Sequence, residues 1–295
     1  MTARPVSQDS LPRRVAGWLH ARPRARLALL LALPVAWLVV AYLGSLAVLF
    51  VNAFWQRDEF TGLVQRTFTL DNFVELLTTP LYGTVLLRTV TMAAAVTLTC
   101  ALLAFPIAFY MARVASPRIR GLLAVAVLMP LWSSYLIKAY SWRLILSEEG
   151  LLNWILQPLG LRGPGQTEIG LWLVFTYLWL PYMILPLYAG LERIPSSLLE
   201  ASSDLGAHAL TTFRRVIFPL VIPALAAGSI FTFSLTLGDY VAPSLITTTQ
   251  FVGNLIFLNF GAPDLPFAAA LSLAPLGVML VYLLLARRLG AFSSL

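Results

Sequence analysis

Charged side chains are scarce in this sequence. Asp, Glu, Lys and Arg make up 11% of its 295 residues and hydrophobic residues 59%, whereas soluble proteins average about 25% charged residues. Such a chain cannot cover itself with polar surface, which excludes a soluble enzyme and a disordered protein and places it in a lipid bilayer. The single cysteine, Cys100, excludes an intrachain disulfide and a disulfide-stabilised secreted scaffold. Because Cys100 lies in an apolar run, we interpret it as a buried, inert thiol.

Side chains that carry catalysis are equally scarce. The two histidines, His20 and His208, lie outside the apolar runs, which excludes an intramembrane serine protease with a histidine base. The only lysine, Lys138, follows no glycine-rich stretch, so the chain has no P-loop and any ATP-driven step requires another chain. The acidic pairs at 58–59 and 148–149 have no matching second cluster. We therefore predict no catalytic residue, no metal and no cofactor in this chain.

Uncharged apolar stretches recur along the sequence. Each is about long enough to cross a hydrocarbon core of roughly 30 Å as a helix. They predict an all-α, polytopic membrane protein with six transmembrane helices, at 27–56, 89–112, 121–137, 169–191, 216–238 and 265–286. The first run is far too long for the core of a signal peptide, so we predict an uncleaved first span.

The basic residues are distributed unequally between the loops. With six spans both termini lie on one side, which then holds 14 of the 20 basic residues, against five on the other side, Arg57, Arg66, Arg88, Arg143 and Arg162. The positive-inside rule therefore predicts a cytoplasmic N-terminus and a cytoplasmic C-terminus. This asymmetry accounts for the net charge of +7 without a nucleic-acid partner. Membrane lipid is the partner that the composition predicts.

The predicted topology divides the chain into three parts. Residues 1–26 form a basic cytoplasmic tail, residues 27–84 the first transmembrane helix and an outer segment, and residues 85–290 a five-helix core. Within the outer segment, a short amphipathic helix is predicted to begin near Asp71 and to end before Pro80.

The cytoplasmic loop 195–219, between the fourth and fifth spans, is too polar for the membrane and too regular for a plain connector. Ser197 and Glu200 form an S-x-x-E capping box, which predicts a helix from about Leu198. Gly206 is placed to end that helix in a left-handed turn, and a second helix then leads into the fifth span. A helix, turn and helix on the cytoplasmic face presents a knob to a partner protein.

The spacing of acidic, small and proline residues in this loop is specific. It reads Glu200-Ala201-Ser202, then Gly206 four residues on, then Val216-Ile217-Phe218-Pro219. This pattern resembles the EAA loop of ABC importer permeases, with Ser202 in place of the usual alanine, and Val216 and Phe218 in place of the usual isoleucine and leucine. The resemblance implies a coupling helix that docks in a groove of a P-loop ATPase subunit. It assigns that role to Glu200, Ala201, Ser202, Asp204, Gly206 and Pro219.

Other stretches extend the resemblance over nearly the whole chain. They are FTLDNF at 68–73 with PLY at 80–82, MPLWSSYLIKAYSW at 129–142, and GDYVAP at 238–243. These motifs resemble those of the spermidine/putrescine-type permeases. The resemblance implies a type I ABC importer permease fold in the bacterial inner membrane and the import of polyamines. It also implies three kinds of partner, namely a second permease subunit, a dimer of ATPase subunits that bind the ATP, and an extracytoplasmic solute-binding protein.

Two alternatives to polyamine import stay open at this point. The first is a permease of the same class that imports another small organic or inorganic ligand, because the motifs are shared by relatives with other substrates. The second is an intramembrane enzyme or a stand-alone channel. A neighbouring gene for a P-loop ATPase would separate the permease from the second alternative.

A pathway for a polycation should offer carboxylates and aromatic faces. Asp239, with Tyr240 beside it, is the acid near a span and a predicted entry contact for the cation; the alternatives are an ion pair with Lys138 or a cap on the loop after Pro243. Trp132 and Tyr135 are three residues apart and would share one helix face, either as part of the pathway or as an aromatic belt. The candidate path thus comprises Asp239, Tyr240, Trp132, Tyr135 and Lys138.

Overall fold

The computed structural model describes residues 22–58, 60–261 and 264–291. The chain divides into two compact units, Met1–Asn52 and Ala53–Leu295. Because the division falls after Asn52, the predicted outer segment belongs with the core and not with the first helix. The boundaries 26/27 and 84/85, which were drawn from topology, stay predictions, and most of the basic tail lies outside the described residues.

The first unit is one long apolar helix with a π-helical turn. It comprises α2 (Pro23–Trp37), η1 (Leu38–Leu43) and α3 (Gly44–Asn52). Pro34 lies inside α2 and the π-helical turn follows four residues later, as expected where a proline removes a backbone donor from the helix ladder. The apolar stretch Arg26–Asn52 is long enough to cross a membrane.

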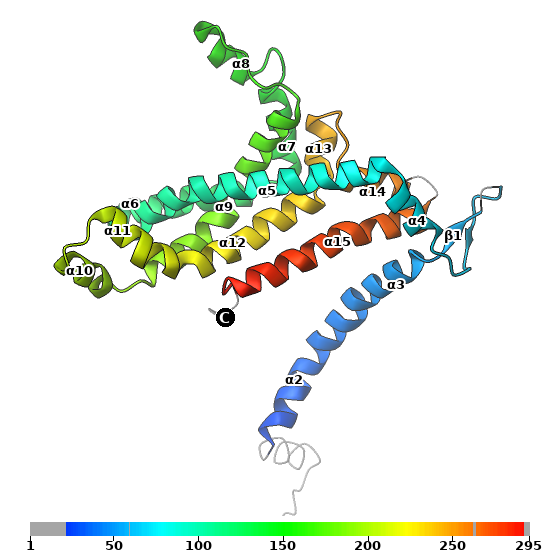
Figure 1. Cartoon of the computed structure of the whole chain (residues 1–295), viewed down its shortest axis with the longest axis horizontal. Coiled ribbons are helices and arrows are strands. Elements are labelled where there is room, and N and C mark those ends of the chain that lie inside the picture. The colour runs from blue at the N-terminus through cyan, green and yellow to red at the C-terminus, as the bar shows by residue number, and fades with distance from the viewer. Residues whose placement is uncertain (1–21, 59, 262–263, 292–295) are drawn as a thin grey trace, which may run out of the picture. The chain divides into compact units, whose positions relative to one another are not determined.

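The second unit is built on a bundle of long apolar helices (Figure 1). They are α5 (Pro80–Phe109), which continues as η2 (Tyr110–Val114), α9 (Glu168–Glu192), α12 (Phe218–Gly238) and α15 (Leu265–Arg288). In the described part of the chain, five helices are long and apolar enough to cross a membrane, and the count is six if a bent helix pair is taken as one span. An all-α membrane architecture with five to six spans is therefore confirmed.

The ends of these helices follow local sequence signals. The Thr167 hydroxyl accepts a hydrogen bond from the Gly170 N–H, 3.3 Å, at the start of α9, and the Asp264 carboxylate accepts one from the Phe267 N–H, 3.1 Å, at the start of α15. Short polar side chains at this position satisfy the free amides of a helix N-terminus. The predicted spans 169–191 and 265–286 lie within two residues of α9 and α15 at each end.

Small residues let α5 and α9 pack closely. Val96, Cys100, Ala104 and Ala108 recur every four residues on α5, and all four side chains are 0% exposed. The Cys100 Sγ lies 3.6 Å from the carbonyl oxygen of Thr176 on α9. Helices in lipid associate through such stripes, because close backbone approach replaces the missing hydrophobic driving force. Cys100 is thus a buried packing residue, as predicted.

The predicted continuous third span, 121–137, is wrong. The chain forms α6 (Pro117–Trp132) and α7 (Tyr135–Ile145), and the two helices are bent by 94° at the intervening serines. Pro130 weakens the last turn of α6, because it has no N–H to donate. The ammonium of Lys138, on α7, donates 2.9 Å to the Pro130 carbonyl oxygen. A cation at a helix C-terminus is favourable, so this contact stabilises the bend.

The outer segment contains a small hairpin that the all-α prediction lacks. Strands β1 (Gln56–Arg57) and β2 (Val64–Gln65) pair antiparallel, with Gln56 opposite Gln65. The Asp58 carboxylate accepts hydrogen bonds from the backbone of Phe60 and Thr61, at 2.9 and 2.8 Å. These bonds, the Thr61 N–H foremost, hold the pKa of Asp58 below its ordinary value. Asp58 therefore organises the hairpin turn.

Four further short helices belong to the second unit among the described residues. The predicted amphipathic helix is confirmed as α4 (Asp71–Thr78), and Pro80 opens α5 directly after it. The others are α8 (Leu151–Leu156), followed by η3 (Gln157–Leu159), α13 (Val241–Ile246) and α14 (Val252–Gly261). The second span therefore starts at Pro80 and not at the predicted 89.

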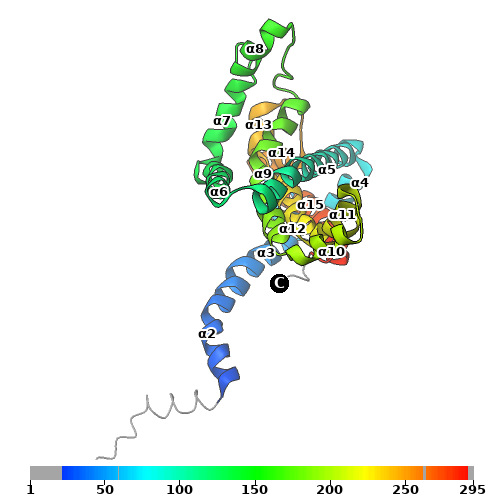
Figure 2. The same ribbon diagram turned by 90° about the vertical axis from the view of Figure 1, so that its left-hand side faces the viewer.

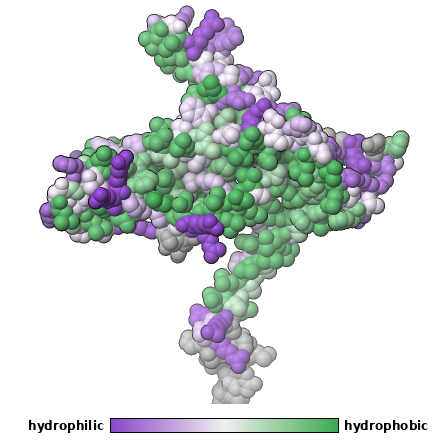
Figure 3. Space-filling model, viewed as in Figure 1, coloured by the Kyte–Doolittle hydropathy of each residue, from purple (hydrophilic) through white to green (hydrophobic). Residues whose placement is uncertain are grey.

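Hydropathy separates the middle of the second unit from its ends. On the face shown in Figure 3, hydrophobic residues predominate over the bundle and hydrophilic residues gather at both of its ends. The outer hairpin lies at one end, and α10 (Ser196–Asp204) and α11 (Ala209–Thr212) lie at the other (Figure 1). The loop 195–219 and the outer hairpin are therefore at opposite ends of the apolar bundle.

Candidate functional site

The loop 195–219 forms a helix, a turn and a second helix at the end of the bundle (Figure 2). Gly206 follows α10 with φ +73°. The Gly206 N–H donates to the Ser203 carbonyl at 2.8 Å and the Ala207 N–H to the Ser202 carbonyl at 3.1 Å, which closes the end of α10. The predicted left-handed turn at Gly206 is confirmed, and so is the second helix, since α11 continues through η4 (Phe213–Ile217) into α12.

The predicted capping box is wrong. Helix α10 begins at Ser196, with Pro195 as its N-cap, and no side chain caps its first turn. Ser197 and Glu200 are both exposed. Pro195 fixes an extended backbone before the helix, which is sufficient to start it without a hydroxyl cap.

A side-chain hydrogen bond ties the two helices of the loop together. The Ser202 hydroxyl, in a residue that is 9% exposed, lies 2.8 Å from the Thr212 hydroxyl at the end of α11. An alanine at 202 would leave this contact unmade, so the departure from the usual motif has a structural role. Sequence reasoning missed Thr212, because two hydroxyl residues ten positions apart give no signal until the turn at Gly206 brings them together.

The outer face of the loop is exposed. Glu200, Ala201 and Asp204 are all exposed. Leu205, next to the turn, is 87% exposed, and Leu210 is 63% exposed. Leucines this exposed at a helical corner are typical of a protein-binding surface. Pro219 is exposed in the first turn of α12, directly after the π-helical turn.

Two arginines join the base of this loop to the preceding helices. The Arg113 guanidinium, in η2, donates to the carbonyls of Leu191 and Ile194, at 2.6 and 2.5 Å. Arg120, on α6, forms an ion pair of 3.5 Å with Glu192. Both contacts hold the last turn of α9, where the chain enters α10. A charged donor that satisfies two terminal carbonyls makes a firm junction, so Arg113 is a positioning residue that the sequence analysis counted only as a basic charge.

Asp239 lies where α12 ends, and it organises the next turn of the chain. Its carboxylate accepts hydrogen bonds from the Tyr135 hydroxyl and from the N–H groups of Val241 and Ala242, the last two at 2.8 and 3.1 Å. The Ala242 N–H also donates to the Tyr135 hydroxyl oxygen, 3.2 Å. Asp239 therefore caps α13 and joins it to α7. The predicted alternative of a cap on the loop after Pro243 is therefore wrong, because the amides that Asp239 caps lie before Pro243.

The predicted alternative of an ion pair between Asp239 and Lys138 is wrong. Lys138 donates to the Pro130 carbonyl instead, and no ion pair links it to Asp239 in the described residues. Trp132, at the last position of α6, is 83% exposed. Because the bend of 94° separates it from Tyr135, the two rings do not share a helix face, and that prediction is also wrong. Of the five candidate path residues, the structure joins Asp239 to Tyr135 and to its neighbour Tyr240.

The segment after Asp239 approaches α14 through a glycine. A Cβ on Gly253 would lie 2.5 Å from the carbonyl oxygen of Asp239 and 2.8 Å from its carbonyl carbon. The Asn254 amide donates to the Tyr240 carbonyl at 3.4 Å and to the Ser244 hydroxyl at 2.5 Å. Tyr240 is 41% exposed and stacks on Phe257 of α14, with 4.6 Å between ring centroids. The turn at Asp239 and α14 thus form one packed junction.

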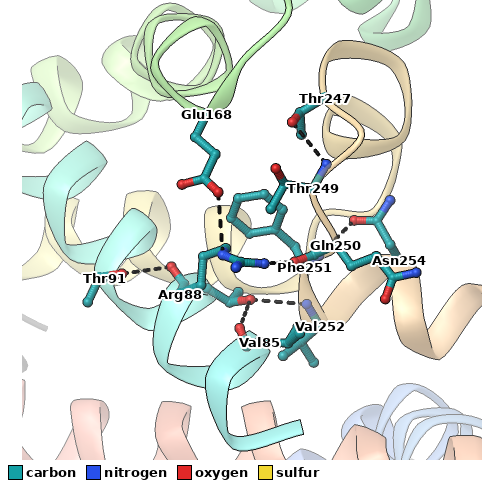
Figure 4. Close-up of polar contacts among 11 residues, drawn as sticks. Val85, Arg88, Thr91, Glu168, Thr247, Thr249, Gln250, Phe251, Val252 and Asn254 are labelled. Carbon is teal, nitrogen blue, oxygen red and sulfur yellow. Dashed lines mark hydrogen bonds and ion pairs between the residues drawn. The ribbon is translucent and has the colours of Figure 1, made fainter. Parts of the chain in front are cut away.

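A second junction fixes the loop before α14 to the bundle (Figure 4). Arg88, on α5, forms an ion pair of 3.4 Å with Glu168 at the start of α9 and donates 3.1 Å to the Gln250 carbonyl. On the next residue of α5, the Thr89 hydroxyl accepts a hydrogen bond of 3.0 Å from the Val252 N–H. Side chains of α5 thereby hold α9 and α14 together. The sequence analysis took Arg88 for a loop charge, because it started the second span too late.

Comparison with known proteins identifies the chain. The family model described as binding-protein-dependent transport system inner membrane component matches residues 104–293. That match includes the loop 195–219 and the junction at Asp239. The chain belongs to this family. It is a multi-pass permease subunit of an ABC importer.

Three relatives resemble the permease over most of its length. The inner membrane ABC transporter permease protein YdcU of Escherichia coli K12 is 45% identical, over 96% of this chain and 95% of the relative. The spermidine/putrescine transport system permease protein PotB of the same organism is 36% identical, over 86% and 95%. PotB of Haemophilus influenzae is 32% identical, over 81% and 85%.

One relative resembles the permease over a shorter stretch, and one solved structure has a similar fold. The spermidine/putrescine transport system permease protein PotC of E. coli K12 is 37% identical over 83 residues, which are 27% of this chain and 31% of PotC. The crystal structure of a bacterial ABC transporter involved in the import of the acidic polysaccharide alginate contains a chain with the same fold. The TM-score is 0.67 at 19% identity, over 92% of the permease and 98% of that chain.

Proposed function

We propose that the permease forms half of the translocation pathway of an ATP-driven polyamine importer. Its coupling to ATP rests on the exposed corner around Gly206, which is the observation that carries the proposal. Leucines at 198, 205 and 210 surround a turn that Ser202 and Thr212 hold in one shape. Such a rigid apolar corner is suited to seat in a groove of an ATPase subunit.

Coupling through this corner requires a stiff connection to the spans. Arg113, in η2, holds the end of α9 and Ile194 just before the loop, and η4 leads without interruption into α12. When ATP closes a pair of partner ATPases, the displaced corner would therefore move α9 and α12 as rigid elements. In this mechanism the pathway opens outward and receives its ligand from an extracytoplasmic binding protein. The ATP is bound by the partner, and the permease itself holds no cofactor.

The ligand proposal is supported by two relatives and by the local chemistry. Both PotB proteins carry the name of a spermidine/putrescine transport system, and Asp239 with Tyr135 offers a carboxylate beside an aromatic face. Polyamine cations bind through these two kinds of group. A second candidate is another small ligand, which is favoured by the higher identity to YdcU, since the name of that relative carries no ligand.

The proposed assembly includes a second permease subunit and lies in the bacterial inner membrane. The partial match to PotC supports a second subunit of related sequence. The excess of basic residues on one side supports a cytoplasmic N-terminus, a cytoplasmic C-terminus and a cytoplasmic loop 195–219. The apolar surface of the bundle is covered by lipid and by the second subunit.

Uptake by the reconstituted complex tests the proposed function. The permease, its second subunit, the ATPase and the binding protein are inserted in vesicles, and uptake of labelled spermidine and putrescine is measured. We expect accumulation that requires both ATP and the binding protein. Vesicles with a non-hydrolysable ATP analogue are the control. Uptake of neither polyamine by a complex whose binding protein stimulates ATP hydrolysis would exclude polyamines and favour another ligand.

A further inference from the structure

A line of aromatic rings leads from Asp239 into the bundle. Tyr135, which donates to the Asp239 carboxylate, stacks on Trp179 of α9 with 6.0 Å between ring centroids and an interplanar angle of 8°. Trp179 contacts Tyr182 one turn further along α9, at 6.0 Å, and Tyr182 stacks on Phe231 of α12, at 6.4 Å. Three helices, α7, α9 and α12, thus contribute to one series of rings that ends at a carboxylate.

The rings differ in their exposure. Phe231 is 53% exposed, and Tyr135 and Tyr182 are half-buried, so each of these three rings presents part of its face. Trp179, which contacts both tyrosines, is 7% exposed. Among the described residues its indole N–H has no hydrogen-bond partner, and burying such a donor without an acceptor costs free energy. A buried tryptophan with an unsatisfied N–H is unfavourable by itself, so we assign Trp179 the role of positioning the two tyrosine rings that it contacts.

The chemistry of this series suits a linear alkylammonium ion. Aromatic faces attract ammonium groups and also pack against methylene groups, and a carboxylate at one end pairs with a terminal charge. Two basic residues lie on α7, Lys138 one turn after Tyr135 and Arg143 in the last turn, and the Pro130 carbonyl holds the Lys138 ammonium at the end of α6. The series therefore provides one anionic end and a polarizable, uncharged body.

The length of the series distinguishes two kinds of polyamine. Phe231 and Asp239 are eight residues apart along α12, which corresponds to about 12 Å at 1.5 Å per residue. An extended triamine such as spermidine is about as long as this, whereas a four-carbon diamine such as putrescine covers only about half of it. On this estimate, a triamine with one ammonium at Asp239 reaches the level of Phe231, and a diamine ends about halfway.

We propose that Tyr182 and Phe231 form a subsite that selects triamines over diamines, with Asp239 as the common anchor and Trp179 as the residue that positions the rings. The inference rests on the proposed polyamine function and extends it to substrate length. In this proposal Asp239 binds every polyamine, whereas Phe231 contacts only the longer ones. Changes at the two ends of the series must then affect the two ligands differently.

Maximal uptake rates of the vesicle-reconstituted complex test this subsite. The binding protein is saturated with spermidine or with putrescine, so that its own preference does not enter the comparison. We expect Phe231→Leu to lower the spermidine rate about threefold, the size of one exposed cation–π contact, and to leave the putrescine rate unchanged. Asp239→Asn should lower both rates, since its remaining oxygen still caps α13 but no longer carries the charge. Phe231→Tyr, which retains the π face, should behave as the wild type.

Two controls separate the subsite from simple packing. Phe260→Leu removes a ring of similar exposure, 47%, from α14 and should change neither rate. Recovery of the intact complex by affinity purification reports whether Phe231→Leu weakens assembly with the second subunit. An unchanged ratio of the two rates in Phe231→Leu, or an equal loss for both ligands, would overturn the subsite while leaving polyamine import in place. Absence of any polyamine uptake by the wild type would overturn both.

Discussion

Gly206→Val is expected to abolish most ATP-dependent transport while the bundle stays folded. Gly206 has φ +73°, and a Cβ added there meets nothing within 4 Å. The substitution therefore acts through the backbone alone, because a β-branched residue in the left-handed region costs roughly 1–2 kcal/mol or more. The chain relieves that strain by opening the turn, which displaces the exposed Leu205. Transport and ligand-stimulated ATP hydrolysis in vesicles measure the loss.

Gly206→Asn is the matched control for this change. Asparagine also adds a Cβ but tolerates the left-handed region far better than valine. We expect it to retain much of the transport that Gly206→Val loses, with equal amounts of both variants in the membrane. Full transport by Gly206→Val would refute the claim that this turn positions the docking surface.

Gly253→Ala should destabilise the permease and strongly reduce transport. The new Cβ would lie 2.5 Å from the carbonyl oxygen of Asp239, a backbone atom that no side-chain rotation can move. Helix α14 must then shift away from the turn, which strains the hydrogen bonds that the Asn254 amide donates to Tyr240 and Ser244. Overpacking of this kind costs typically 1–3 kcal/mol. The midpoint of thermal unfolding in detergent and the uptake rate should both fall.

Gly277→Ala, in the middle of α15, is the control for Gly253→Ala. A Cβ at this position meets nothing within 4 Å. Alanine has the higher helix propensity by up to about 1 kcal/mol, so the variant should be as stable as the wild type or slightly more stable. Equal stability of Gly253→Ala and Gly277→Ala would contradict the expected clash between a Cβ at 253 and the Asp239 carbonyl.

The strongest sequence signals predicted the features that the structure confirms. Long uncharged runs gave the spans of α9 and α15 almost to the residue, because nothing but a helix satisfies the backbone in lipid. The left-handed turn at Gly206 was predicted correctly, because a glycine directly after a polar helix commonly ends that helix in this conformation. The coupling role of Glu200, Ala201 and Asp204 came from a motif and stays a prediction.

Features that depend on contacts distant in sequence were missed. Pro130 and the two following serines gave no signal for a bend of 94°, since prolines also occur in unbroken membrane helices. The hydrogen bond from Lys138 to the Pro130 carbonyl depends on that bend, so the predicted ion pair with Asp239 was wrong. The pairing of Ser202 with Thr212 and the series from Tyr135 to Phe231 require the packed arrangement of α7, α9, α11 and α12. Composition and spacing alone do not contain that arrangement.

Photo-cross-linking from position 205 tests the central claim most directly, namely that the loop 195–219 docks on an ATPase in the cytoplasm. The native Cys100 is 0% exposed and gives no background, whereas Leu205 is 87% exposed and Phe60, on the outer hairpin, is 99% exposed. Leu205→Cys and Phe60→Cys are labelled with a photoreactive maleimide in the assembled complex. We predict capture of the ATPase subunit from position 205 and none from position 60. Capture from position 60, or none from position 205 in an intact complex, would contradict the account.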